Sequence, residues 1–198
     1  MEVSTIISWV VLIFVLFYIV RIYNLLVAYK NQYENAFAQI EVQLKRRYDL
    51  IPNLVEATKA YLTHEKETLE AVISARNTAL AGLKEASKNP GNAAALSKIA
   101  AGEGMLKSAL GALNVAVEAY PELKANQNIA DLTEELTSTE NRVSYSRQAF
   151  NDSVMQYNVF RQSFPNNFFA PTFGHRTDAA LLEFEDSKEI QQAPKVSF

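Results

Sequence analysis

Residues 22–61 read IYNLLVAYKNQYENAFAQIEVQLKRRYDLIPNLVEATKAY, and their apolar side chains recur alternately three and four positions apart. This spacing is typical of a helix that presents one face to a bundle or coiled coil. Pro52 lacks a backbone donor, which predicts a kink at that position. The predicted stripe consists of Leu26, Tyr29, Tyr33, Phe37, Ile40, Leu44, Arg47, Ile51, Leu54, Thr58 and Tyr61.

The residues before this stretch form a separate apolar segment. Val3 to Val20 contains no charged side chain, and about 18–20 apolar residues cross the core of a bilayer as a helix. A cleaved signal peptide would begin with a cationic region, which is missing before Val3. The first flanking cations, Arg21 and Lys30, follow the segment. By the positive-inside rule we expect a single-pass anchor, with the N-terminus outside and the helical domain in the cytoplasm.

The residues after the quoted stretch predict three more helices. The sequence Asn89-Pro90-Gly91 is a strong turn signal, and Pro121 ends or bends the helix before it. A further apolar stripe covers about residues 126–162. Short connections make neighbouring helices antiparallel. We therefore predict an all-α fold, in which an N-terminal transmembrane helix continues into an elongated antiparallel bundle of about four helices, two long and two short.

The prediction divides the chain into three parts. Residues 1–21 form the transmembrane anchor, residues 22–163 form the antiparallel bundle, and residues 164–198 form an aromatic and acidic C-terminal tail. Because the last helix runs back along the first, the tail begins near the membrane.

Aromatic side chains make this tail a candidate contact for a partner or a membrane. They either rest in the bilayer interface or fill a groove between the first and last helices. The chain ends with Val196 and Phe198 two positions apart, a spacing that suits strand addition to a PDZ-type partner. The aromatic residues are Phe164, Phe168, Phe169 and Phe173.

Charged residues within the predicted stripes indicate a polar layer in the middle of the bundle. Counted from the turns, Arg47, Arg76 and Glu103 fall at similar heights. We expect Glu103, together with Glu140 of the last helix, to pair with the two arginines and to set the register between helices. Alternatively, these side chains extend to solvent at the edge of the stripe. Neither arrangement is evidence for catalysis.

The sequence offers little support for an enzyme or for a cofactor. It contains no cysteine, and the segment His64–Thr68 begins like the zinc motif H-E-x-x-H but has Thr68 where the second histidine is needed. Gly102 and Gly104 lie in a helical pattern, where they permit close helix packing, and do not form a phosphate-binding loop. The net charge of −3 argues against a nucleic-acid partner.

Several segments together resemble the LemA family of bacterial membrane-anchored helical proteins. They are an N-terminal anchor followed by YNLLVAYKNQYENAFAQIEVQLKRRYDLIPNL, then VEAYPELKANQNIADLTEELTSTENRVSYSRQ, then FPNN and the final APKVSF. The resemblance implies an elongated antiparallel bundle, with a short N-terminus outside the bacterial cytoplasmic membrane and the main domain inside. The family tail usually reads FGF, whereas this chain has Phe173-Gly174-His175.

These observations favour a non-enzymatic membrane scaffold or adaptor. We expect it to form homo-oligomers or to bind a membrane protein through the tail and through an exposed apolar seam between the first and last helices. The alternative is a helical protein that binds or organises the lipid bilayer directly.

Overall fold

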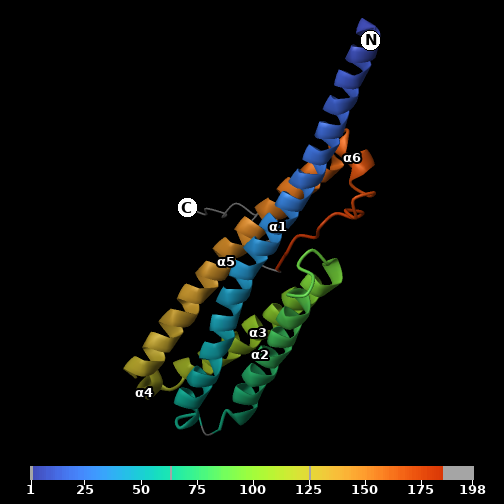
Figure 1. Cartoon of the computed structure of the whole chain (residues 1–198). Coiled ribbons are helices and arrows are strands. Elements are labelled where there is room, and N and C mark those ends of the chain that lie inside the picture. The colour runs from blue at the N-terminus through green and yellow to red at the C-terminus, as the bar shows by residue number, and fades with distance from the viewer. Residues whose placement is uncertain (1, 63, 125, 185–198) are drawn as a thin grey trace, which may run out of the picture.

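The computed structural model describes residues 2–62, 64–124 and 126–184, and these ranges contain helices and turns without a strand. The predicted all-α fold is confirmed. The two long helices are α1 and α5, the two shorter ones are α2 and α3, and α4 and α6 are single turns (Figure 1). Their bounds are α1 Val3–Lys59, α2 Lys66–Ala86, α3 Ala93–Glu118, α4 Pro121–Lys124, α5 Gln127–Gln162 and α6 Asn166–Phe169.

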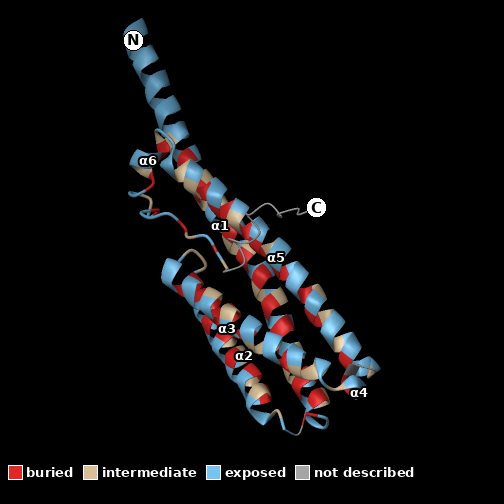
Figure 2. Cartoon of the chain, turned by 180° about the vertical axis from the view of Figure 1, so that it is seen from behind, coloured by how far each residue is buried: buried red, intermediate tan, exposed pale blue. Residues whose placement is uncertain are grey.

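The predicted anchor and the first bundle helix are one continuous helix. α1 runs for 57 residues and passes through Pro52. Its N-terminal part is long and apolar enough to cross a membrane, and residues 3–18 are exposed all round (Figure 2). Burial begins at Ile19 and is almost complete at Ile22. No flexible linker therefore separates the apolar segment from the bundle.

The bundle consists of two close helix pairs. α5 runs back along α1, and α3 runs back along α2 (Figure 1). The α2–α3 pair lies beside the half of α1 that is remote from the N-terminus. Asparagine side chains begin two of these helices: Asn92 accepts from the backbone N–H of Ala95, and Asn126 accepts from that of Asn128. Such caps satisfy donors that a helix start leaves without partners.

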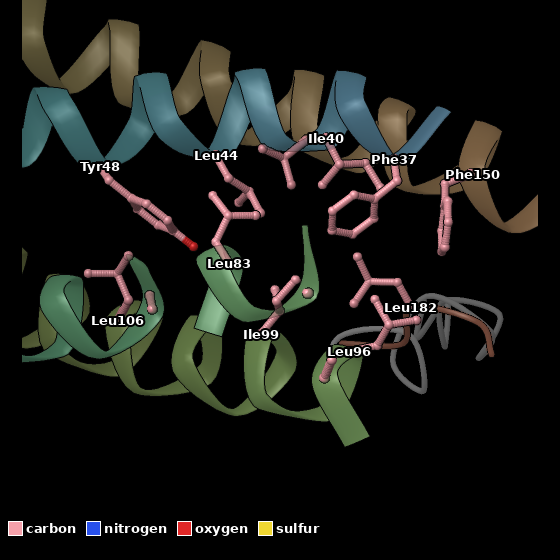
Figure 3. Packing of buried hydrophobic residues seen from close by; sticks show 14 of the residues in the cluster. Phe37, Ile40, Leu44, Tyr48, Leu83, Leu96, Ile99, Leu106, Phe150 and Leu182 are labelled. Carbon is pink, nitrogen blue, oxygen red and sulfur yellow. The ribbon is translucent and has the colours of Figure 1, made fainter. Parts of the chain in front are cut away.

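The apolar stripe of α1 forms the centre of the core. Figure 3 shows Ile40 and Leu44 of α1 directed toward Leu83 of α2 and Ile99 of α3. Nearly all predicted stripe residues are buried, although Tyr61 is 37% exposed. The expectation of an exposed apolar seam between α1 and α5 is wrong, because these two helices pack closely against each other.

Small residues bring α2 and α3 together. A Cβ atom on Gly102 would lie 2.8 Å from the Cα atom of Ala79, and one on Gly82 would lie 3.1 Å from the carbonyl oxygen of Lys98. The absence of a side chain at Gly102 thus permits the close approach of the two backbones. This agrees with the packing role predicted for Gly102.

The substitution Gly102→Ala should lower the free energy of unfolding by about 1–3 kcal/mol, since the added methyl group forces α2 and α3 apart. Gly111→Ala in the same helix is the control, because its methyl group meets no atom within 4 Å. It should raise stability by about 0.5–1 kcal/mol through helix propensity. Denaturant unfolding followed by circular dichroism measures both, and equal stabilisation by the two variants would contradict the tight packing at Gly102.

Candidate functional site

A buried group of three polar side chains lies between α1 and α3. Nη1 of Arg47 is 2.7 Å from Oε2 of Glu103, and the hydroxyl of Tyr48 donates to Oε1 of the same carboxylate at 2.6 Å. The side chains of Arg47 and Glu103 are only 8% and 5% exposed. Charge-assisted hydrogen bonds of this kind offset part of the cost of removing both charges from water.

Burial is also the main influence on protonation in this cluster. It raises the pKa of Glu103 above the ordinary value of 4.5, while the Arg47 guanidinium and the Tyr48 hydroxyl oppose this shift and the charge of Glu140 adds to it. Burial, together with the neighbouring Glu103, also raises the pKa of Tyr48. The folded chain holds the proton of the Glu103 carboxyl more tightly than the unfolded chain does. The free energy of unfolding therefore falls as the pH rises from 4.5 through the raised pKa of Glu103.

The structure brings together only part of the predicted polar layer. Arg76 does not share Glu103 with Arg47: its Nε donates to the carbonyl of Tyr48 at 2.9 Å, and its Nη2 lies 3.6 Å from Asp49. The expected pairing of Glu103 with both arginines is therefore wrong. Glu140 is exposed on α5 and acts on Glu103 through its charge.

An open cleft between α3 and α5 lies beside this cluster, and α1 forms its floor. Its polar section has a volume of about 300 Å³ and is lined by Glu103, Ser144 and Phe184, among others. Its apolar section, about 310 Å³, is lined mainly by Leu54, Leu110, Leu113, Val117, Ile129 and Leu136. Both sections include Arg47, Lys107 and Glu140, so they form one continuous surface, which we call the α3–α5 cleft.

The four predicted phenylalanines of the tail have two different environments. The ring of Phe173 packs edge-on against Tyr23 of α1 at 5.2 Å and stacks with Phe169 at 6.4 Å. Phe164 and Phe168 remain 80% and 69% exposed, with their rings 5.9 Å apart. Val196 and Phe198 lie outside the described residues, so their predicted role stays a prediction.

Two asparagines of α5 hold the rest of the described tail, and the sequence analysis did not single them out. The side chain of Asn158 exchanges hydrogen bonds of 2.9 Å with the backbone N–H and C=O of Ala179. Asn151 does the same with Leu182, at 2.9 and 3.1 Å. Asn151 and Asn158 are seven residues apart, as are equivalent positions of the apolar stripe. This spacing was the sequence feature that could have indicated that both face the bundle.

Two further buried polar groups also escaped the sequence analysis. Nδ1 of His175 lies 2.9 Å from the hydroxyl of Tyr157, with which it forms a hydrogen bond. Arg147 is 7% exposed, and its guanidinium lies 4.6 Å from the ring centre of Phe184. Both contacts join α5 to the tail and hold the tail against the bundle.

These groups pack the helices and the tail against one another. Within the described ranges, no group of three His, Asp or Glu side chains is arranged to hold a metal ion.

A helix able to cross a membrane, joined directly to a helical bundle, places the chain among membrane-associated helical-bundle proteins. The sequence pattern of the LemA family matches residues 36–198. The chain belongs to the LemA family, and the resemblance seen in its sequence is confirmed.

Similar proteins include three magnetosome proteins. Magnetosome protein MamQ of Magnetospirillum gryphiswaldense is 29% identical over an alignment of 167 residues, and the match covers 75% of this chain and 61% of the relative. MamQ 1 and MamQ 2 of Paramagnetospirillum magneticum are each 27% identical over an alignment of 164 residues, and each match covers 75% of this chain and 60% of the relative. The chain thus spans about three fifths of the length of these relatives. Neither the family name nor these protein names denote an enzymatic activity.

The substitution Arg47→Met should lower the free energy of unfolding by about 3–5 kcal/mol near neutral pH, because it leaves the buried Glu103 carboxylate without its cation. The pKa of Glu103 then rises further, so the loss should shrink as the pH falls and the carboxylate takes up a proton. Denaturant unfolding at a series of pH values measures both effects.

The neighbouring Arg46 provides a matched control. It pairs with Glu135 at 2.6 Å, but the two side chains are 50% and 40% exposed. Arg46→Met should therefore cost less than about 1 kcal/mol. The triple variant Arg47→Met, Glu103→Leu, Tyr48→Phe should recover most of the lost stability, since no buried polar atom of the cluster remains. Equal costs for Arg46→Met and Arg47→Met would contradict this account.

Acidification should loosen the tail through His175. Burial, with the nearby charges of Lys30 and Arg161, lowers the pKa of His175 below its ordinary value of 6.5. As the pH falls, His175 takes up a proton in the unfolded chain before it does so in the folded chain. The contribution of neutral His175 to the free energy of unfolding is therefore present above pH 6.5 and is lost as the pH falls toward the lowered pKa. His175→Gln keeps a hydrogen-bonding group near Tyr157 but cannot titrate there, so it should flatten the rise in tail proteolysis between about pH 7 and pH 5. An identical pH dependence in both proteins would exclude His175 as the cause.

Proposed function

We propose that this chain is a non-enzymatic scaffold of the bacterial cytoplasmic membrane, which presents a rigid helical domain to a protein partner or to further copies of itself. The N-terminus lies outside and the domain lies in the cytoplasm. The observation that carries this proposal is the unbroken course of α1 from the apolar segment into the bundle core. A helix without a linker holds whatever binds the domain at a fixed place relative to the membrane.

The α3–α5 cleft is the surface we assign to the partner. Its apolar section offers a trough of leucine and isoleucine side chains, Lys107 and Glu140 line both sections, and Ser144 lines the polar section. An amphipathic helix lays its apolar face into such a groove and uses polar contacts at the groove's end for orientation. The partner predicted by this chemistry is an amphipathic helix, either of a membrane protein or of another copy of the chain.

A direct action on lipid is the second candidate function. The observation in its favour is the exposure of Phe164 and Phe168 at the end of α5 that lies nearest the apolar part of α1. It differs from the scaffold in that it needs no protein partner.

Full-length protein released from membranes in a mild detergent should form a particle larger than one chain, either with further copies or with a second protein in fixed ratio. Ser144→Arg places a long side chain in the cleft from an exposed position on α5 and should reduce this assembly. The adjacent Tyr145→Arg is the control, because Tyr145 is 74% exposed and does not line the cleft. Particle mass and the identity of co-purifying chains provide the readout.

Three outcomes decide the matter. Assembly lost only with Ser144→Arg supports the scaffold and its cleft. If assembly is retained in both variants, the partner binds a surface other than the α3–α5 cleft. A strictly monomeric protein without a co-purifying chain contradicts the scaffold function.

A further inference from the structure

The point at which the helical domain begins is fixed by the burial of α1. Val20, the last residue of the apolar segment, is 55% exposed, while Ile22 is only 2% exposed. α6 packs against α1 near this level (Figure 1). The ring of Phe173 contacts that of Tyr23. The domain therefore starts within one helical turn of the apolar segment, a distance of about 5 Å.

Two exposed phenylalanines lie at this junction, and we call them the aromatic ledge. Phe164 follows the end of α5, Phe168 belongs to α6, and their rings meet edge to face. At 80% and 69% they are as exposed as Phe14 and Phe17 of the apolar segment, which are 70% and 69% exposed. The core does not use either ring, although the neighbouring Phe169 and Phe173 are packed against it.

The backbone of the ledge is held firmly, so the exposure of the two rings follows from a fixed fold. The side chain of Asn166 donates to the carbonyl of Phe160 at 2.9 Å, and the backbone N–H of Ala170 donates to the carbonyl of Asn166 at 2.8 Å. Ala170 is completely buried. Two large apolar rings on an anchored turn are typical of a surface that meets another apolar phase.

The occupant follows from continuity with the apolar segment. The ledge lies beside α1 where α6 and Phe173 contact that helix, just after its apolar segment ends. That segment is the part of the described chain able to lie in lipid. Arg21, which directly follows the apolar segment, and Arg176 of the tail are both exposed cations. Aromatic rings at the boundary, with cations just beyond it, match the arrangement of a bilayer interface with its phosphate groups.

We propose that Phe164 and Phe168 insert into the bilayer interface beside α1 and give the domain a second contact with lipid. The inference rests on the proposed anchoring of α1 and adds to it. A single helix can turn about its own axis in the membrane, whereas two contacts fix the direction in which the bundle and its α3–α5 cleft face. The ledge thus orients the domain on the membrane surface.

Tryptophan quenching in lipid tests this proposal with the full-length chain. Trp9 is the single tryptophan and lies within the apolar segment. The test variants combine Trp9→Phe with either Phe168→Trp or, as a control, Tyr145→Trp. Tyr145 is also an exposed aromatic residue of the helical domain, but it lies 18 residues before Ser163, about 27 Å from the end of α5. Each protein is placed in vesicles of phosphatidylcholine and phosphatidylglycerol, with or without bromine atoms on the upper part of the acyl chains.

The expected result is strong quenching and a blue-shifted emission for Phe168→Trp, with neither effect for Tyr145→Trp. If the native Trp9 is quenched but Phe168→Trp is not, the ledge proposal is overturned while the anchor stands. If Trp9 itself is not quenched, the membrane anchor, and the proposed function with it, is overturned. Protection of Phe168→Trp from both brominated lipid and aqueous acrylamide would show that a protein covers the ledge, which also overturns the lipid contact.

Discussion

The stripe of α1 is the constraint on which the other packed elements depend. α5 covers one side of it along most of the bundle, the α2–α3 pair covers the remote half, and the tail covers the half nearest the apolar segment. Arg47 of the buried cluster belongs to this stripe, and its partner Glu103 comes from α3. A shift of α3 by one turn would displace Glu103 by about 5.4 Å and leave buried polar groups without partners, so the cluster favours a single alignment of the layers.

The tail continues the layer that the α2–α3 pair begins. The two meet where the backbone N–H of Ala180 donates to the carbonyl of Gly91 in the turn between α2 and α3, at 3.1 Å. Beyond that turn, Leu182 and Ala179 take over the burial of the α1–α5 face. The tail has no regular secondary structure there, so its backbone polar groups need other partners. Asn151 and Asn158 supply some of these partners, which allows the tail to pack against the helices.

Periodicity predicted the fold well because each long helix carries its stripe in its own sequence. Counting residues from the turns also placed Arg47 level with Glu103. The count also placed Arg76 at this height, where it contacts Tyr48 and Asp49. It did not give the direction of the side chain, since each residue turns a helix by about 100° and a small error in register directs a side chain elsewhere. Tyr48 lay outside the stripe pattern, and the asparagine contacts to the tail depend on tertiary positions that local sequence does not encode. The cleft likewise arises from the spacing between helix pairs, which no single segment specifies.

Because α1 is one continuous helix, a change in the tilt of its apolar segment also moves the remote end of the bundle. In this helix 39 residues follow the apolar segment, a length of roughly 58 Å. A change of about 10° in the tilt of the segment would sweep the remote end of the bundle through roughly 10 Å, and tilt responds to the thickness of the surrounding bilayer. In a chain anchored as proposed, a small difference in membrane thickness would therefore produce a much larger displacement at the remote end of the bundle.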